Sequence, residues 1–89
     1  MFQVVWLQSA LDELAALWMQ ADSAGRRSIT AATESIDQLL QTDPAEKGES
    51  RSQGRRILLQ PPLGVTFEVR QNVSAVRVLH VWAFRKRGR

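Results

Sequence analysis

The apolar residues of this 89-residue chain follow two different periods, and this change limits the kinds of fold that the chain can form. Between residues 9 and 42, apolar side chains recur every three or four positions, as they do along one face of an α-helix. Over residues 2–6 and 57–82, apolar positions alternate or run together, as they do in the strands of a β-sheet. The sequence therefore predicts helices in the front half and a sheet built mainly from the back half.

Two helices are predicted after the first strand. The first spans about residues 9–21 and has Ser9 as its N-cap. Its apolar face is formed by Leu11, Leu14, Ala15 and Trp18. The second helix is capped by Asp22 or Ser23 and ends at Asp43-Pro44, because the residue before a proline disfavours helical backbone. Its apolar face is formed by Ile29, Ala32, Ile36, Leu39 and Leu40. We expect the helices to form a hairpin with both apolar faces in the core.

Four strands are predicted around this hairpin. They cover residues 2–6, 57–59, 65–69 and 75–82. The strand at 57–59 contains only apolar residues, which predicts that it is buried, and Pro61-Pro62 ends it. A turn near Asn72 would place Arg77 opposite Glu68 on one face of the sheet, where the two side chains would form an ion pair.

A polar segment, residues 43–54, separates the helices from the last three strands. Ala45 is its only apolar residue apart from proline and glycine, so the segment cannot contribute to a core and is predicted to be a mobile loop. The element order β-α-α-β-β-β predicts an α+β fold in which a helical hairpin packs on a small, mainly antiparallel sheet. Residues 1–89 are interpreted as one domain.

Charge is divided unequally along the chain. Residues 1–50 contain three basic and eight acidic residues, a net charge of −5, whereas residues 51–89 contain nine basic residues and one acid, a net charge of +8. The formal total of +3 hides this difference. A folded back half with this charge suits a polyanion or an acidic protein as its partner.

Composition excludes several kinds of chemistry. The chain has no cysteine and one histidine, so disulfides and thiol catalysis are excluded, and neither a metal site nor a cofactor is expected. The N-terminal residues have no basic flank and reach an acid at Asp12, so neither a signal peptide nor a membrane span is predicted. We expect a cytoplasmic protein.

Three sequence blocks in the back half follow a helical hairpin that ends near Asp-Pro. They are Gly-Arg-Arg-Ile-Leu at residues 54–58, Val-Thr-Phe-Glu-Val at 65–69 and Val-Arg-Val-Leu-His-Val-Trp at 76–82. In this order and spacing, the elements resemble the RelE/ParE superfamily of type II toxins, also called plasmid stabilisation proteins. The likeness covers nearly the whole chain. It implies a small toxin that a cognate antitoxin neutralises and whose target is either DNA gyrase or mRNA on the ribosome.

The resemblance implies different chemistry for the two targets. RNA-cleaving members of the family use converging cations to hold the phosphate, and an RNA 2′-hydroxyl is the nucleophile. The cations available here are Arg51, Arg55, Arg56, Arg77 and Arg85. Those members usually carry an arginine early in the third strand and a His or Tyr near the C-terminus. The matching stretches here are Leu63-Gly64-Val65 and Trp82-Ala83-Phe84-Arg85, which lack both residues. This departure favours ParE-like, non-enzymatic inhibition of gyrase over RelE-like cleavage of mRNA.

Candidate site residues come from the same comparison. If the protein is an enzyme, the catalytic candidates are Arg55, Arg56, Arg85 and His80. No acid adjoins His80 in the sequence, and we interpret it first as a residue of the sheet. The residues predicted to bind a target or the antitoxin are Arg51, Arg55, Arg56, Trp82, Arg85, Lys86 and Arg87.

Some alternatives stay open at this stage. Trp82, at the end of a strand, is suited equally to packing and to stacking on a base, whereas Trp6 and Trp18 are interpreted as packing residues. A non-toxic nucleic-acid-binding member of the family is a third class of function. For a toxin, we expect an antitoxin segment to lie across the sheet and to add a helix or a strand to it.

Overall fold

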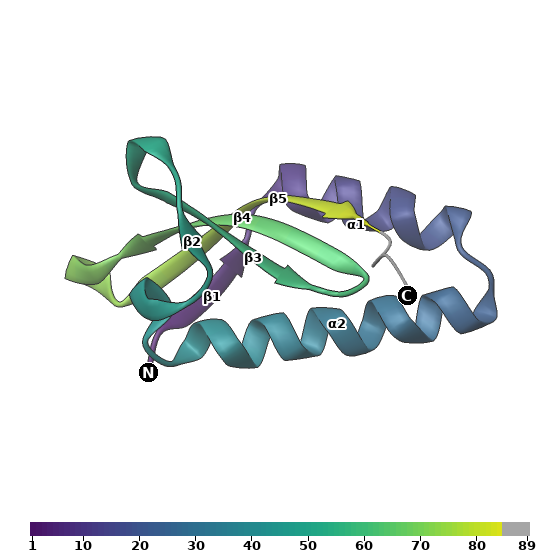
Figure 1. The fold of residues 1–89 in the computed structure, drawn as a ribbon, viewed down its shortest axis with the longest axis horizontal. Coiled ribbons are helices and arrows are strands. Elements are labelled where there is room, and N and C mark those ends of the chain that lie inside the picture. The colour runs from purple at the N-terminus through teal and green to yellow at the C-terminus, as the bar shows by residue number, and fades with distance from the viewer. Residues whose placement is uncertain (85–89) are drawn as a thin grey trace.

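Helices and strands follow the predicted order, with one additional short strand. The computed structural model describes residues 1–84. The helices are α1 (Gln8–Gln20) and α2 (Ser23–Gln41), and the strands are β1 (Gln3–Trp6), β2 (Glu49–Ser50), β3 (Arg55–Gln60), β4 (Leu63–Arg70) and β5 (Ala75–Ala83). Three 3-10 turns, η1 (Pro44–Glu46), η2 (Ser52–Gly54) and η3 (Gln71–Val73), connect them. The sheet order is β1-β5-β4-β3-β2, in which only the β1–β5 pair is parallel (Figure 1). The predicted α+β fold is confirmed.

The core lies between α2 and one face of the sheet (Figure 1). Its helical side is formed by Ile29, Ala32, Ile36 and Leu40, as predicted. Its sheet side is formed by Leu63, Val65 and Phe67 of β4 and by Val76, Val78 and Val81 of β5. Most of these side chains are completely buried, and at about 25 cal/mol per Å² their burial is the main favourable term for folding.

Helix α2 begins and ends where the sequence predicts. The Asp22 carboxylate accepts a hydrogen bond from the Gly25 backbone N–H at 2.8 Å and so caps the helix. At the other end, Asp43 has left-handed backbone with φ of 48°, and Pro44 is buried just beyond it. Within residues 1–84, no helix is both long and apolar enough to cross a membrane.

Helix α1 differs from its prediction in its start and in its buried face. It begins at Gln8, and its N-cap is Leu7, which makes no side-chain hydrogen bond. Its inward side is formed by Ala10, Leu14 and Leu17. The predicted face was therefore wrong for Leu11, Ala15 and Trp18, which are all exposed; the exposed fractions of Leu11 and Trp18 are 44% and 40%. Because apolar residues occur on most sides of this helix, their spacing alone did not fix which side is buried.

The edge of β5 explains this orientation of α1. Strand β1 pairs with β5 only as far as Val78, and the rest of β5 has no strand on that side among residues 1–84. There the Ser9 hydroxyl donates to the Leu79 carbonyl at 2.7 Å, and the Glu13 carboxylate accepts from the Val81 N–H at 3.0 Å. Ser9 was predicted to cap the helix, and this was wrong: its hydroxyl bonds to the sheet instead. Side chains of α1 satisfy the backbone groups that another strand would pair.

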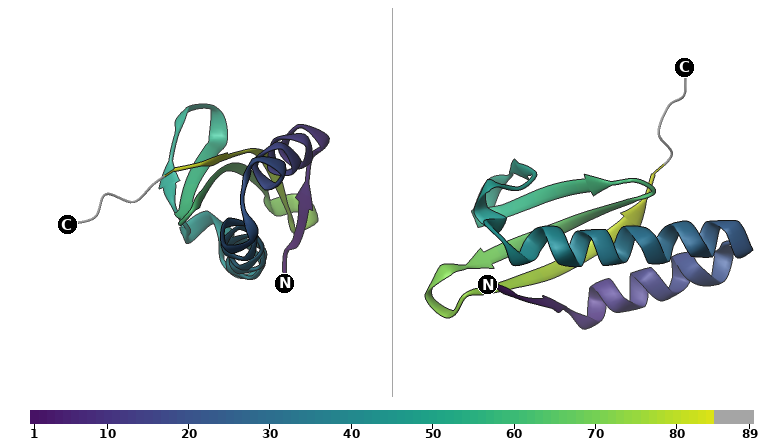
Figure 2. Two further views of the ribbon diagram at one scale, coloured as in Figure 1. Left: turned by 90° about the vertical axis from the view of Figure 1, so that its right-hand side faces the viewer. Right: turned by 90° about the horizontal axis from the view of Figure 1, so that it is seen from below.

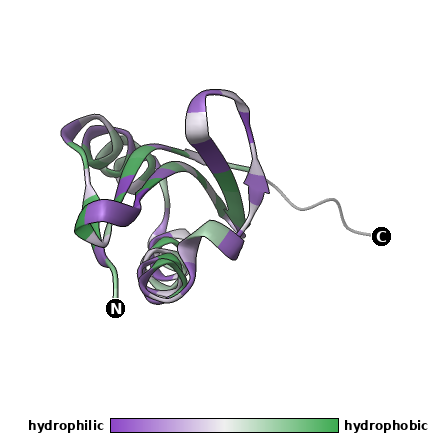
Figure 3. Cartoon of the chain, turned by 90° about the vertical axis from the view of Figure 1, so that its left-hand side faces the viewer, coloured by the Kyte–Doolittle hydropathy of each residue, from purple (hydrophilic) through white to green (hydrophobic). Residues whose placement is uncertain are grey.

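The polar segment after α2 also differs from its prediction. Instead of a mobile loop, it forms η1, η2 and the two-residue strand β2, which pairs with Arg56 and Ile57 of β3. Its colouring in Figure 3 is mostly hydrophilic, and Pro44 is its one buried side chain. The Arg56 guanidinium donates to the Lys47 and Gly48 carbonyls at 2.8 and 3.2 Å. Backbone pairing between β2 and β3 also holds the segment in place. Hydrophobic patterning cannot detect a segment that is ordered in this way.

Replacing Glu13 by Ala tests how much the edge contact contributes. The substitution leaves the partly buried Val81 N–H without its partner, which should lower the free energy of unfolding by about 1–2 kcal/mol. For a domain of this size, that corresponds to a fall in Tm of roughly 4–8 °C per kcal/mol, measurable by circular dichroism. Asp12→Ala is the control, because Asp12 bonds only to the exposed Gln8 side chain among residues 1–84. Equal losses in the two variants would contradict this role for Glu13.

Candidate functional site

The sheet face that points away from α2 carries three cross-strand rows of side chains. From β3 to β5 the rows are Arg55–Glu68–Arg77, Ile57–Thr66–His80 and Leu59–Gly64–Trp82. Paired residues point to the same face, and their neighbours along β4 point into the core. We call these nine residues the open sheet face. Figure 2 shows α2 on the other side of the sheet.

Charge on the open sheet face and beside it is only partly compensated. The Glu68 carboxylate lies 3.5 Å from the Arg77 guanidinium and 3.4 Å from that of Arg70. The predicted ion pair between Glu68 and Arg77 is therefore confirmed. Such pairs near the surface add little stability, and the single carboxylate compensates only part of the charge of the two arginines.

The predicted arginine cluster is divided between two sides of β3. Arg55 points to the open sheet face and has no ion pair among residues 1–84. Arg56 pairs across the ladder with the buried Phe67, and its guanidinium bonds to backbone carbonyls. The Arg51 backbone N–H donates to the Arg55 carbonyl at 2.7 Å, but the Arg51 guanidinium forms an ion pair with Glu49 at 3.0 Å. Consecutive strand residues point in opposite directions, so Arg55 and Arg56 cannot act on one group.

The remaining basic candidates lie outside the described residues. They are Arg85, Lys86 and Arg87. They follow Phe84, the last residue that the structure describes.

His80 has an acidic partner that the sequence did not indicate. Its Nδ1 atom lies 3.2 Å from the Glu13 carboxylate, whose other oxygen holds the Val81 N–H. The two residues are 67 positions apart, so no local pattern brings them together. Glu13 is the residue of this site that sequence reasoning missed. The contact agrees with His80 as a hydrogen-bonded sheet residue at the rim of the open sheet face.

The three tryptophans have different environments. Trp82 covers Gly64: a Cβ atom added to this glycine would lie 2.6 Å from the indole Cε2 atom. Trp6 packs against the core and donates its indole N–H to Asp37 at 3.0 Å, which confirms a packing role. Trp18 lies near the α1–α2 turn, with the Arg26 guanidinium 5.5 Å from its ring centre, and was wrongly placed in the core.

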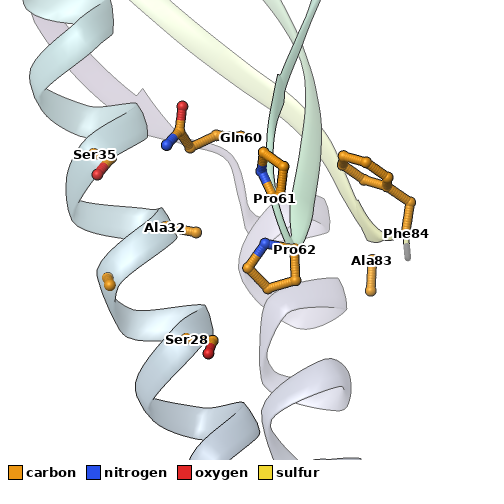
Figure 4. Close-up of a pocket in the computed structure, with 9 residues that line it drawn as sticks. Ser28, Ala32, Ser35, Gln60, Pro61, Pro62, Ala83 and Phe84 are labelled. Carbon is orange, nitrogen blue, oxygen red and sulfur yellow. The ribbon is translucent and has the colours of Figure 1, made fainter. Parts of the chain in front are cut away.

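A groove runs along α2 on the side of the sheet opposite the open sheet face (Figure 4). Its volume is about 770 Å³. One wall is formed by Ser28, Ala31, Ala32 and Ser35 of α2, and the other by Gln60, Pro61, Pro62, Ala83 and Phe84. We call these nine residues the α2 groove. The groove was not predicted, because its walls come from three distant segments and contain no distinctive motif.

Comparison with known proteins adds a clear structural relationship. Neither a protein-family model nor a curated protein matches this sequence. Solved structures do match. A chain of the chromosomal ParDE TA system from P. aeruginosa superposes with a TM-score of 0.76 at 18% identity, covering 96% of this chain and 98% of that one. The chain has the fold of the RelE and ParE toxins.

Structures of RelE-type toxins also match this chain over most of its length. A chain of the toxin-antitoxin complex RelBE2 from Mycobacterium tuberculosis gives a TM-score of 0.72 at 18% identity, covering 92% of this chain and 90% of that one. The isolated E. coli RelE toxin gives 0.63 at 16% identity, covering 98% and 88%. At these identities the comparisons show the shared RelE/ParE fold, and the mechanism has to be argued from residues.

The two stretches that depart from the pattern of the RNA-cleaving members lie at the start of β4 and at the end of β5. Leu63 and Val65, at the start of β4, are completely buried, and Gly64 between them lies under Trp82. No cation stands at this point. Ala83 is the last residue of β5, and both it and the following Phe84 line the α2 groove instead of the open sheet face.

Replacing Gly64 by Ala tests the contact between this backbone and Trp82. The added methyl group overlaps the indole ring, so the free energy of unfolding should fall by about 1–3 kcal/mol. In a Trp82→Ala background the same substitution should cost much less, because the overlapping ring is gone. Urea titration of the four proteins in this double-mutant cycle measures the coupling. A cost that does not depend on Trp82 would contradict the contact.

Proposed function

We propose that this protein is the toxin component of a type II toxin-antitoxin system, neutralised by a cognate antitoxin, and that it inhibits DNA gyrase without enzymatic action. The observation that carries the proposal is the match to the ParDE chain, which extends over 96% of this chain and 98% of that one. The match extends over nearly the whole of both chains and is not limited to the buried core. Fold alone does not determine function, so the residues of the open sheet face supply the rest.

The open sheet face is better suited to binding than to RNA cleavage. Electrostatic catalysis of phosphate transfer needs several cations that converge on one oxygen. Here Glu68 forms ion pairs with both Arg70 and Arg77, and the Arg56 guanidinium donates to a backbone carbonyl on the other side of β3. Neither Leu63 nor Ala83 can supply the missing cation or move a proton. This arrangement supports a surface that recognises a protein target.

RelE-like cleavage of mRNA on the ribosome is the second candidate. Two RelE-type structures match this fold, and Arg55 and His80 occupy adjacent rows of the open sheet face. In this mechanism Arg55 and Arg85 hold the phosphate and His80 transfers a proton. The Glu13 carboxylate lies 3.2 Å from Nδ1 of His80 and would orient the imidazole for such a role.

A supercoiling assay with purified gyrase separates the two candidates. The chain is expected to block supercoiling of relaxed plasmid and to leave mRNA intact in a cell-free translation reaction. Arg55→Ala should weaken the block by about tenfold, because it removes the exposed cation of the charged row. Arg27→Ala, an exposed arginine on α2, is the matched control and should change little. Cleavage of translated mRNA together with normal supercoiling would exclude the gyrase proposal in favour of the second candidate.

Expression in cells tests the broader proposal. The chain alone should arrest growth, and co-expression of the adjacent reading frame should restore it. Normal growth without the neighbour would contradict toxicity. Binding of DNA or RNA that weakens steeply with salt would then favour a non-toxic nucleic-acid-binding protein.

A further inference from the structure

We infer that the exposed side of α1 is a contact surface between two copies of this chain, which pair through their α1 helices in antiparallel orientation. This side is formed by Leu11, Ala15, Trp18 and Met19, and we call these four residues the outer α1 face. Helix α1 lies at the margin of the molecule (Figure 2). The inference does not rest on the proposed function, because the outer α1 face shares no residue with the open sheet face or with the α2 groove.

Helix α1 exposes apolar side chains where a surface helix normally exposes polar ones. Leu11, Trp18 and Met19 are all exposed, and the exposed fraction of Met19 is 75%. Two of the polar side chains of the helix, Ser9 and Glu13, are instead turned toward the edge of β5, where they bond to its backbone. Large apolar side chains that gather on one side of a helix mark an interaction surface.

Helix α2 provides a comparison within the same chain. Its exposed positions are mainly polar and include Arg27, Thr30, Glu34 and Gln38. Both helices cover the same small domain, yet only α1 combines several large apolar side chains on its exposed side. The outer α1 face is therefore not a general result of the small size of the chain.

The spacing of the outer α1 face makes it complementary to itself. Leu11 and Trp18 are seven residues apart, which is close to two helical turns, so both side chains lie on one side of the helix. In two antiparallel helices related by a two-fold axis midway between these residues, Leu11 of each copy packs against Trp18 of the other. Ala15 lies beside this axis, and its small side chain allows the helix axes to approach to about 8 Å.

Charge at the two ends of α1 favours the antiparallel orientation. The helix carries its acids, Asp12 and Glu13, in its first half and contains no basic residue. At its C-terminal end, the Arg26 guanidinium lies 5.5 Å from the centre of the Trp18 ring and donates to the Trp18 carbonyl at 2.9 Å. Neither Asp12 nor Arg26 forms an ion pair among residues 1–84. Antiparallel pairing places the acidic half of each helix beside the basic end of the other, whereas parallel pairing would place like charges together.

The size of this contact indicates a reversible dimer. Helix α1 has 13 residues and is therefore about 20 Å long. A stable interface buries about 800 Å² per partner, which is more than one helix of this length contributes. We therefore expect a Kd of roughly 10–100 μM for the dimer. A two-fold contact uses the same face on both copies, so association stops at two chains.

Sedimentation equilibrium tests the inference. The average mass should rise from 10.0 kDa toward twice that value as the concentration passes through the expected Kd. Ala15→Arg brings two guanidinium groups together beside the axis and should raise the Kd at least about tenfold. Ala16→Arg is the matched control, because it makes the same change at an exposed position about 100° further round the same helix. It should change the Kd less than about twofold, and circular dichroism establishes that both variants are folded.

Mixing two variants tests the two-fold symmetry. Ala15→Glu and Ala15→Arg each repel their own copies, so each should be monomeric when it is alone. An equimolar mixture should form dimers again, because opposite charges then meet beside the axis. This recovery is expected only if position 15 of one copy meets position 15 of another.

Four results would overturn the inference. A constant mass of 10.0 kDa at every concentration would show that the copies do not pair. Equal effects of Ala15→Arg and Ala16→Arg would place the contact elsewhere on the chain, and a mixture that stays monomeric would exclude the two-fold arrangement. If the polypeptide encoded by the adjacent reading frame binds Ala16→Arg but not Ala15→Arg, and the original chain stays monomeric, the outer α1 face belongs to a different partner. None of these measurements depends on growth arrest or on supercoiling, so their outcome is separate from that of the proposed function.

Discussion

Burial of the sheet on one face only is the constraint on which the rest of this structure depends. A chain of 89 residues supplies one apolar layer, and α2 provides it through four side chains that cover β4 and β5. Every second residue of those strands consequently points away from the core. The open sheet face is therefore a direct result of the size of the chain, and its exposed positions can vary in charge without disturbing the core.

Helix α1 covers the part of the β5 edge that has no strand partner among residues 1–84. Strand β1 is too short to cover this edge, and Ser9 and Glu13 bond to the backbone that β1 leaves exposed. Because these two polar contacts fix the rotation of the helix, an apolar stripe that includes Leu11 and Trp18 remains at the surface. The same contacts bring Glu13 to His80, so the packing of the edge also sets the environment of the one histidine.

The sequence predicted those features that depend on periodicity and local capping. The α2 stripe through Ile36 and Leu40, the Asp22 cap and the register that pairs Glu68 with Arg77 could all be read from spacing. The predictions were wrong where the sequence allowed more than one orientation of a side chain and tertiary contacts decided between them. Leu59 was predicted to be buried because its strand is apolar, yet β3 lies near the sheet edge and Leu59 is 55% exposed. Likewise, two adjacent arginines suggested one cluster, and the alternation of a strand separated them.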